Sequence, residues 1–206
     1  AITGAATFIT TAANSNITLG QSGNAFGSEV TMQSGNGTAA FGNLTFVDSG
    51  PVRLHDEADT DGDLYINAVN PDGTVGGTLS VTANGDITQT VDLVVAGTTT
   101  LAAGSSNDIT LSNASNNFAT VVITSGRNVS LRDAGAIILG ASTVSGTYGI
   151  TAGGAVTDSG TQEIAGVTTI SASGQDVTLN TATNNFADEV RITGAAVTVV
   201  DEDAID

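Results

Sequence analysis

Residues 108–123, Asp-Ile-Thr-Leu-Ser-Asn-Ala-Ser-Asn-Asn-Phe-Ala-Thr-Val-Val-Ile, contain the pattern that decides the fold. An apolar, polar, apolar triplet at 109–111 is followed by an Asn-Asn-Phe segment and by a second apolar stretch that ends at Ile123. Alternation with a period of two over so few residues predicts short strands with one buried face. The Asn and Ser residues between them predict turns and no helical crossover.

The same pattern occurs in two other places, around residues 16–32 and 176–192. In each copy a phenylalanine stands nine positions after the first apolar residue: Phe26 after Ile17, Phe118 after Ile109 and Phe186 after Val177. Other blocks recur in the same order: 44–48 matches 129–133 and 197–201, whereas 75–83 and 96–101 match 144–152 and 165–170 with an offset of 69 residues. Chance does not produce so many blocks in register, so the chain is built from an internal repeat.

A repeat of this kind favours a solenoid over an antiparallel sandwich, because a sandwich gives each strand a different environment. If three coils share 69 residues, each coil has about 23 and equivalent blocks lie directly above one another. We therefore predict an all-β fold, a right-handed parallel β-helix (β-solenoid), for residues 1–206. It would hold about three copies of a three-coil repeat, of which the first and last are incomplete. Since both ends fall inside a repeat, we expect further copies or neighbouring subunits to stack end to end.

One segment interrupts the repeat. Leu54 aligns with Leu139 and Thr74 with Thr143, so the first copy has 16 additional residues. Residues 55–70 should therefore form an inserted acidic surface loop or hairpin. Its alternating acids resemble the first half of a calcium loop, although Ala68 occupies the twelfth position, where a carboxylate is expected. Two interpretations stay open, a solvated acidic turn and a calcium site with these candidate ligands: Glu57, Asp59, Asp61 and Asp63.

Composition excludes several classes of partner. The chain has 21 Asp and Glu, four Arg and no Lys, with a formal net charge of −17. Nucleic acid and anionic membranes need a cationic surface, so neither is expected as a partner. No apolar stretch of roughly 18 residues is present, so no membrane insertion is predicted. The acidic, Lys-free composition fits an extracellular medium, and a chain that starts without Met at Ala1 is expected to be part of a longer protein.

At the level of whole blocks, the chain resembles the repeat regions of very large bacterial surface proteins of the filamentous-haemagglutinin type. The resemblance rests on residues 77–90 (GTLSVTANGDITQT), 95–160 and 185–199 (NFADEVRITGAAVTV) and covers nearly the whole chain outside the insertion. It implies a right-handed parallel β-helix, secretion to the cell surface, and a role in adhesion, biofilm matrix or fibre formation. A host-cell, bacterial or glycan receptor would be the partner.

The remaining candidate side chains have structural explanations. We expect the recurring phenylalanines, and Asn24, Asn116 and Asn184 before them, to fill corners of the coil; a sugar-binding aromatic stripe is the functional alternative. Asp133, Asp158, Asp188, Asp201 and Asp203 are expected to form turns by bonding to their own backbone. His55 and Arg53 lie beside the acidic insertion without a nucleophile motif, so the chain is predicted not to be an enzyme. The alternative is a calcium-dependent glycan-binding or polysaccharide-degrading β-helix protein.

Overall fold

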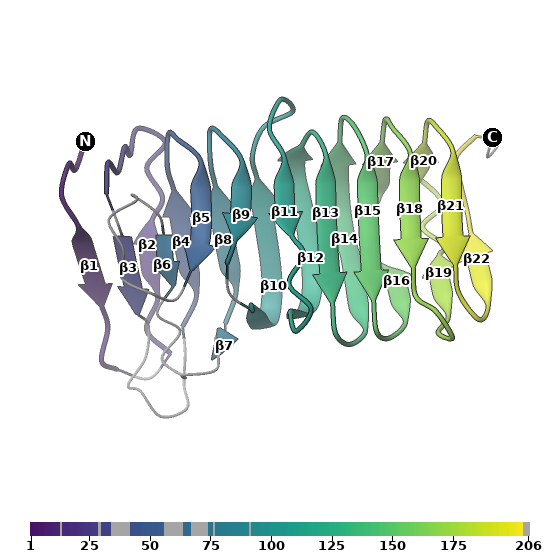
Figure 1. The fold of residues 1–206 in the computed structure, drawn as a ribbon, viewed down its shortest axis with the longest axis horizontal. Helices are drawn as coiled ribbons and strands as arrows, with labels where there is room; N and C mark the ends of the chain where they lie inside the picture. Colours follow the sequence, from purple (N-terminus) through teal and green to yellow (C-terminus); the bar gives the residue numbers. More distant parts are fainter. Residues whose placement is uncertain are drawn as a thin grey trace.

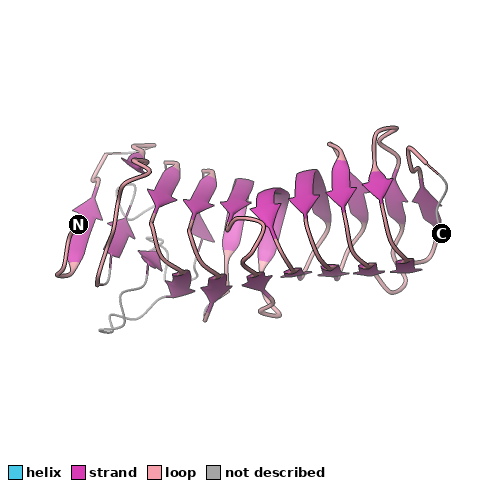
Figure 2. Ribbon diagram, turned by 90° about the horizontal axis from the view of Figure 1, so that it is seen from above, coloured by secondary structure: helices cyan, strands magenta, loops and turns pink. Residues whose placement is uncertain are grey.

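The computed structural model describes residues 1–12, 14–28, 30–33, 42–55, 64–66, 74–75, 77–90 and 92–203. Within these ranges the chain forms strands and turns and no helix, so no described segment is a helix that could cross a membrane. Parallel strands stack into a β-solenoid of about eight turns. Figure 1 and Figure 2 show an elongated rod with the two chain termini at opposite ends. The predicted all-β parallel solenoid is confirmed.

Two sheets form the wall of the rod. The ten-stranded sheet contains, in spatial order, β1 (Ala6–Ile9), β3 (Val30–Gln33), β6 (Leu64–Ile66), β5 (Val52–His55), β9 (Ile87–Gln89), β11 (Ile109–Leu111), β13 (Val129–Asp133), β15 (Tyr148–Ala152), β18 (Thr168–Ser171) and β21 (Val190–Thr193). The main path of the twelve-stranded sheet contains β2 (Ile17–Leu19), β4 (Leu44–Val47), β8 (Leu79–Thr82), β10 (Val94–Ala102), β12 (Asn117–Gly126), β14 (Ile137–Val144), β16 (Val156–Asp158), β19 (Val177–Leu179) and β22 (Val197–Val199). Three short strands pair beside this path: β7 (Thr74–Val75), β17 (Gln162–Ile164) and β20 (Asn185–Phe186).

The length of a turn follows from the register of the ten-stranded sheet. Five successive pairings lead from Ile87 to Val190, through Ile109, Val129, Tyr148 and Thr168. A turn therefore takes roughly 21 residues. The value of about 23 expected from the sequence is too long, because it assumed that the 69-residue offset contains a whole number of turns.

Equivalent blocks of the repeat do not lie above one another. Ile109 belongs to β11 of the ten-stranded sheet, whereas Ile17 of β2 and Val177 of β19 belong to the twelve-stranded sheet. The 68 residues from Ile109 to Val177 make about 3.3 turns at this turn length. Each copy thus begins about a third of a turn further around the rod, and the expectation of direct stacking is wrong. All three side chains are nevertheless buried, because every side of the coil offers the same one-sided environment.

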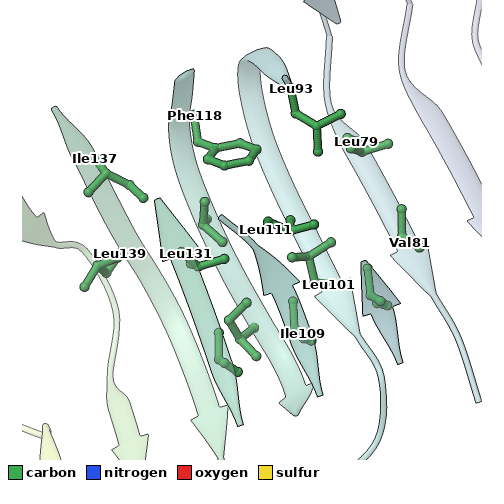
Figure 3. Packing of buried hydrophobic residues seen from close by; sticks show 14 of the residues in the cluster. Leu79, Val81, Leu93, Leu101, Ile109, Leu111, Phe118, Leu131, Ile137 and Leu139 are labelled. Atoms are coloured by element: carbon green, nitrogen blue, oxygen red, sulfur yellow. The ribbon is translucent and has the colours of Figure 1, made fainter. Parts of the chain in front are cut away.

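The core is mostly aliphatic and continuous along the rod. In β13 burial alternates strictly along the strand, with Val129 and Leu131 pointing inward and Ser130 pointing outward. Figure 3 shows Leu101 of β10 and Leu111 of β11 among the buried side chains between the two sheets. The period-two pattern of the sequence therefore gives the inner and outer faces correctly.

The first copy differs from the others in the segment predicted as an insertion. Leu64–Ile66 form β6, which pairs in parallel with β3 and with β5. These three residues are thus part of the ten-stranded sheet, between β3 and β5. His55 ends β5, and the other residues between 55 and 70 lie outside the described ranges.

Glycine is required at one corner of the coil. The Gly166 N–H donates to the Gly146 carbonyl at 3.1 Å, and a Cβ on Gly166 would lie 2.7 Å from that oxygen. In the preceding copy, Gly97 and Gly77 make the same contact with the same distances. Both neighbours are backbone, so they cannot move aside without shifting a whole coil.

We expect Gly166→Ala to lower the free energy of unfolding by about 2 kcal/mol, as typical overpacking does. Urea unfolding followed by circular dichroism measures the loss. Gly149→Ala is the matched control, because a Cβ at Gly149 meets only the Val129 carbonyl oxygen, at 3.6 Å. Equal losses for the two variants would contradict the steric explanation.

Candidate functional site

The predicted calcium ligands Glu57, Asp59, Asp61 and Asp63 lie outside the described residues. Among the described residues, no group of three or more His, Cys, Asp or Glu side chains is placed to hold a metal ion. Arg53 lies half-buried on β5. Calcium binding by the acidic segment therefore stays a prediction.

The recurring phenylalanines belong to the core. Phe118 and Phe186 are buried, and the partly buried Phe26 stacks on Phe46 with ring centroids 5.3 Å apart. The buried rings of Phe118 and Phe186 present no face to the solvent on which a sugar could stack. Their predicted role as core residues is confirmed, and the structure places Phe118 on β12 and Phe186 on β20.

The asparagines before these phenylalanines satisfy backbone groups inside the corners. Asn116 is fully buried, and its Oδ1 accepts the Leu93 N–H at 2.8 Å while its Nδ2 donates to the Leu111 carbonyl at 3.2 Å. Asn184 is also fully buried and accepts the Gln162 N–H at 2.9 Å. The bonds to Leu93 and Gln162 join neighbouring coils, since these partners lie 23 and 22 residues away, whereas the bond to Leu111 closes the local turn. The predicted structural role of the asparagines is confirmed.

Asp133 links two coils through its carboxylate. Its Oδ2 accepts the Phe118 N–H at 2.6 Å and its Oδ1 accepts the Gly135 N–H at 2.8 Å. Only 2% of the residue is exposed, and this burial raises the pKa of its carboxyl group. The bond to Gly135 is the predicted turn, but the bond to Phe118 was missed.

The other two copies contain the same bond. The Phe26 N–H donates to Asp48 at 2.9 Å and the Phe186 N–H donates to Asp201 at 3.1 Å. The Asp follows the Phe by 15 residues in the second and third copies and by 22 in the first, so the recurrence of both residues was the signal in the sequence, and only the structure shows that they bond. This Asp and Phe pair is a repeated structural clamp of the solenoid.

A second acidic residue forms an ion pair on the surface. Asp108 accepts two bonds from Arg127, from Nε and Nη2, each at 2.8 Å, and a third from the Asn128 N–H at 3.1 Å. The Arg127 guanidinium lowers the pKa of Asp108 to about 2. The side chain of Arg127 is half exposed, so the pair is open to water and salt.

We expect the contribution of this ion pair to stability to depend on pH between about 4 and 2. Because the folded pKa of Asp108 is lowered, the contribution is present above the unfolded value and is lost as the pH falls through the folded one. The difference in unfolding free energy between the wild type and Arg127→Gln should be small at pH 6 and should shrink towards pH 2. Urea unfolding at a series of pH values measures it. A difference that does not change with pH would contradict the pairing.

A shallow groove runs over the outward face of the ten-stranded sheet. Four outward residues on adjacent strands are register partners: Ser130 on β13, Gly149 on β15, Thr169 on β18 and Arg191 on β21. Figure 1 shows these four strands side by side on the near face of the rod. The groove has a volume of about 420 Å³, and Thr147 and Val167 also line it.

Charge at the groove comes from one ion pair. Nε and Nη2 of Arg191 donate to the two carboxylate oxygens of Glu189, at 2.8 and 2.5 Å. This pairing lowers the pKa of Glu189 and raises that of Arg191. Both side chains are more than half exposed. The pair therefore offers hydrogen-bond donors and acceptors to the solvent with no net charge.

Sequence reasoning missed this groove. Its residues are spaced by 19, 20 and 22 positions, and nothing in one strand shows which outward residue of the next coil is its neighbour. One difference between aligned copies of the repeat could have indicated the groove: Gly149 stands where the earlier copy has Ser80.

A model of the family described as repeats of unknown function (DUF5649) matches residues 1–33, 58–125 and 126–193. The last two matched segments are adjacent and have the length of the internal repeat, and the first of them includes residues 58–70 of the predicted insertion. Comparison with curated proteins and with solved structures gave no match. Because the family model matches most of the sequence, the chain belongs to this family of repeats.

Proposed function

We propose that the chain is a structural and adhesive segment of a secreted bacterial surface filament, and that its role is not enzymatic. The observation that carries the proposal is the uninterrupted parallel pairing along a rod of about eight turns with one aliphatic core. Such a solenoid is stabilised by contacts between neighbouring coils, so it can be extended by adding copies without a change of fold. That property suits a fibre.

The last described coil supports extension through further repeats or stacked subunits. The inward side chains Val190 and Ile192 of β21 are only partly buried, whereas Ile170 on the adjacent strand β18 is buried. A further coil stacked on β21, the last of the described strands in this sheet, would cover them and pair with its outer edge. The partner in this proposal is another copy of the same repeat.

The surface of the rod supports a location outside the cell. Outward positions of the described strands are mostly Thr and Ser, and the net charge of −17 opposes lateral aggregation of rods. The resemblance to repeat regions of filamentous-haemagglutinin-type proteins favours the same location and an adhesive role. A receptor would then bind to an outward face of a sheet.

Immunogold electron microscopy tests the proposal. An antibody raised against this chain should label thin fibres or rods on the surface of the source cells. Pre-immune serum on the same cells is the control. Label confined to the cell interior, or to compact particles, would contradict the filament role.

The groove on the ten-stranded sheet favours a second function, binding of a glycan. Its outward hydroxyl groups and its neutral ion pair are the kind of groups that recognise sugar hydroxyls. Dependence of this binding on calcium rests on the acidic segment and stays a prediction.

A further inference from the structure

Gly149 lines the groove and has no side chain to fill it, and the fold does not need glycine there. Gly149 is not among the described glycines with a positive φ, and a Cβ on it would make only an ordinary contact, 3.6 Å from the Val129 carbonyl oxygen. Glycine inside a strand weakens the strand, and it often marks a close approach by a ligand. The equivalent position in the earlier copy holds Ser80.

The space above Gly149 is bounded by hydroxyl groups. Ser130 and Thr169 are its register partners on β13 and β18, and both are exposed. Neighbouring strands lie about 4.8 Å apart, so the two side chains stand roughly 10 Å from each other across the gap. The groove is open to the solvent, and its volume of about 420 Å³ lies at the lower end of the range for small-molecule sites.

The ion pair at the next strand completes the set of polar groups. The bonds to Glu189 use Nε and Nη2 of Arg191, which leaves Nη1 for an acceptor on a ligand. The carboxylate oxygens of Glu189 can accept bonds from vicinal hydroxyls. Val167 supplies an apolar patch for the C–H face of a sugar ring.

The charge of the protein selects between neutral and acidic sugars. Glu189 neutralises Arg191, and the chain as a whole carries −17, so a polyanionic glycan is repelled. We infer that the groove over Gly149 binds a neutral sugar unit of a glycan, with Ser130, Thr169, Arg191 and Glu189 as its polar contacts. This inference rests on the adhesive function proposed above and assigns it a site.

Nuclear magnetic resonance titration of the ¹⁵N-labelled chain tests the inference. The probes are lactose, cellobiose and maltose as neutral disaccharides, and digalacturonate as an acidic one. At least one neutral disaccharide should shift the amide signals of Gly149 and Thr169 in a saturable way. Digalacturonate should bind more weakly or not at all.

Two variants probe the groove itself. Gly149→Thr fills the gap and should weaken binding at least about tenfold, because a site with a blocked or unpaired contact rejects its ligand. Its free energy of unfolding should stay equal or rise, since threonine is better than glycine in a strand. Arg191→Gln should also weaken binding. Ser80→Thr is the matched control, because it adds a methyl group at the equivalent outward position on the other sheet and should leave binding unchanged.

Three results would overturn the inference: unchanged affinity in Gly149→Thr, tighter binding of digalacturonate than of the neutral probes, or no shift at Gly149 with any disaccharide. None of them affects the filament role, which surface labelling decides independently. Fibres without disaccharide binding would leave a structural filament with no sugar site in this groove.

Discussion

Replacing Phe118 with alanine should lower the free energy of unfolding by about 3–5 kcal/mol, the usual cost of removing a buried aromatic ring. Phe118 is fully buried and pairs in register with the buried Val95 of β10. The adjoining coils are fixed by ladders of backbone hydrogen bonds on both sides, so they cannot collapse into the space. The variant keeps a cavity in addition to the lost burial of the ring.

Urea or thermal unfolding followed by circular dichroism measures this loss. Ile138→Ala is the matched control, because Ile138 lies on the neighbouring strand β14 with 40% of its surface exposed. We expect the control to change the free energy of unfolding by less than about 1 kcal/mol. If Phe118→Ala lowered the free energy of unfolding by as little as the control does, the ring would not be packed in the core.

Asp133→Ala should cost about 3 kcal/mol at pH 7, because the N–H groups of Phe118 and Gly135 lose their acceptor at a buried site. Part of that loss is offset, since the charged carboxylate no longer has to be desolvated. The raised pKa of Asp133 reports the same desolvation. Removing the carboxylate should therefore weaken the junction between two coils without changing the core.

The cost of Asp133→Ala should also depend on pH. Because the folded pKa is raised, the stability that Asp133 contributes is fully present below the unfolded value of 3.8 and declines as the pH rises through the folded pKa. The loss should thus be larger at pH 3 than at pH 7. Asp188→Ala is the control, because Asp188 is exposed and accepts a bond from the N–H of its neighbour Glu189 within the same coil. A loss at Asp133 that matched this control at both pH values would contradict the clamp.

The sequence predicted the class of fold because its signals are local. Alternation at Ile109, Thr110 and Leu111 gives a strand and its inward face, and Asn and Gly residues give the corners. Recurrence of these units then favours a solenoid. The recurring Phe118 was correctly interpreted as a core residue, because an apolar residue in register with core positions is normally core. Asn116 was correctly interpreted as a residue that satisfies backbone groups at a bend.

The number of residues in each turn of the solenoid could not be predicted in the same way. The prediction assumed that the 69 residues of one repeat make a whole number of turns. A repeat needs to contain only a whole number of strands with their corners, and these need not complete a turn. The sides of the coil offer similar environments, so copies that begin at Ile17, Ile109 and Val177 can occupy different sides with no loss of burial. The turn of roughly 21 residues is visible only in the pairing of strands.

The sequence by itself determined which side chains point inward and that the strands repeat, since each of these depends on residues within a few positions of each other. Only the tertiary structure decided which residues of different coils are neighbours, because that depends on the path length of every corner between them. The Asp133 bond to Phe118 and the row of Ser130, Gly149, Thr169 and Arg191 both belong to this second class. One residue more or less in a corner would shift every outward neighbour, because strand side chains alternate between the two faces of the sheet.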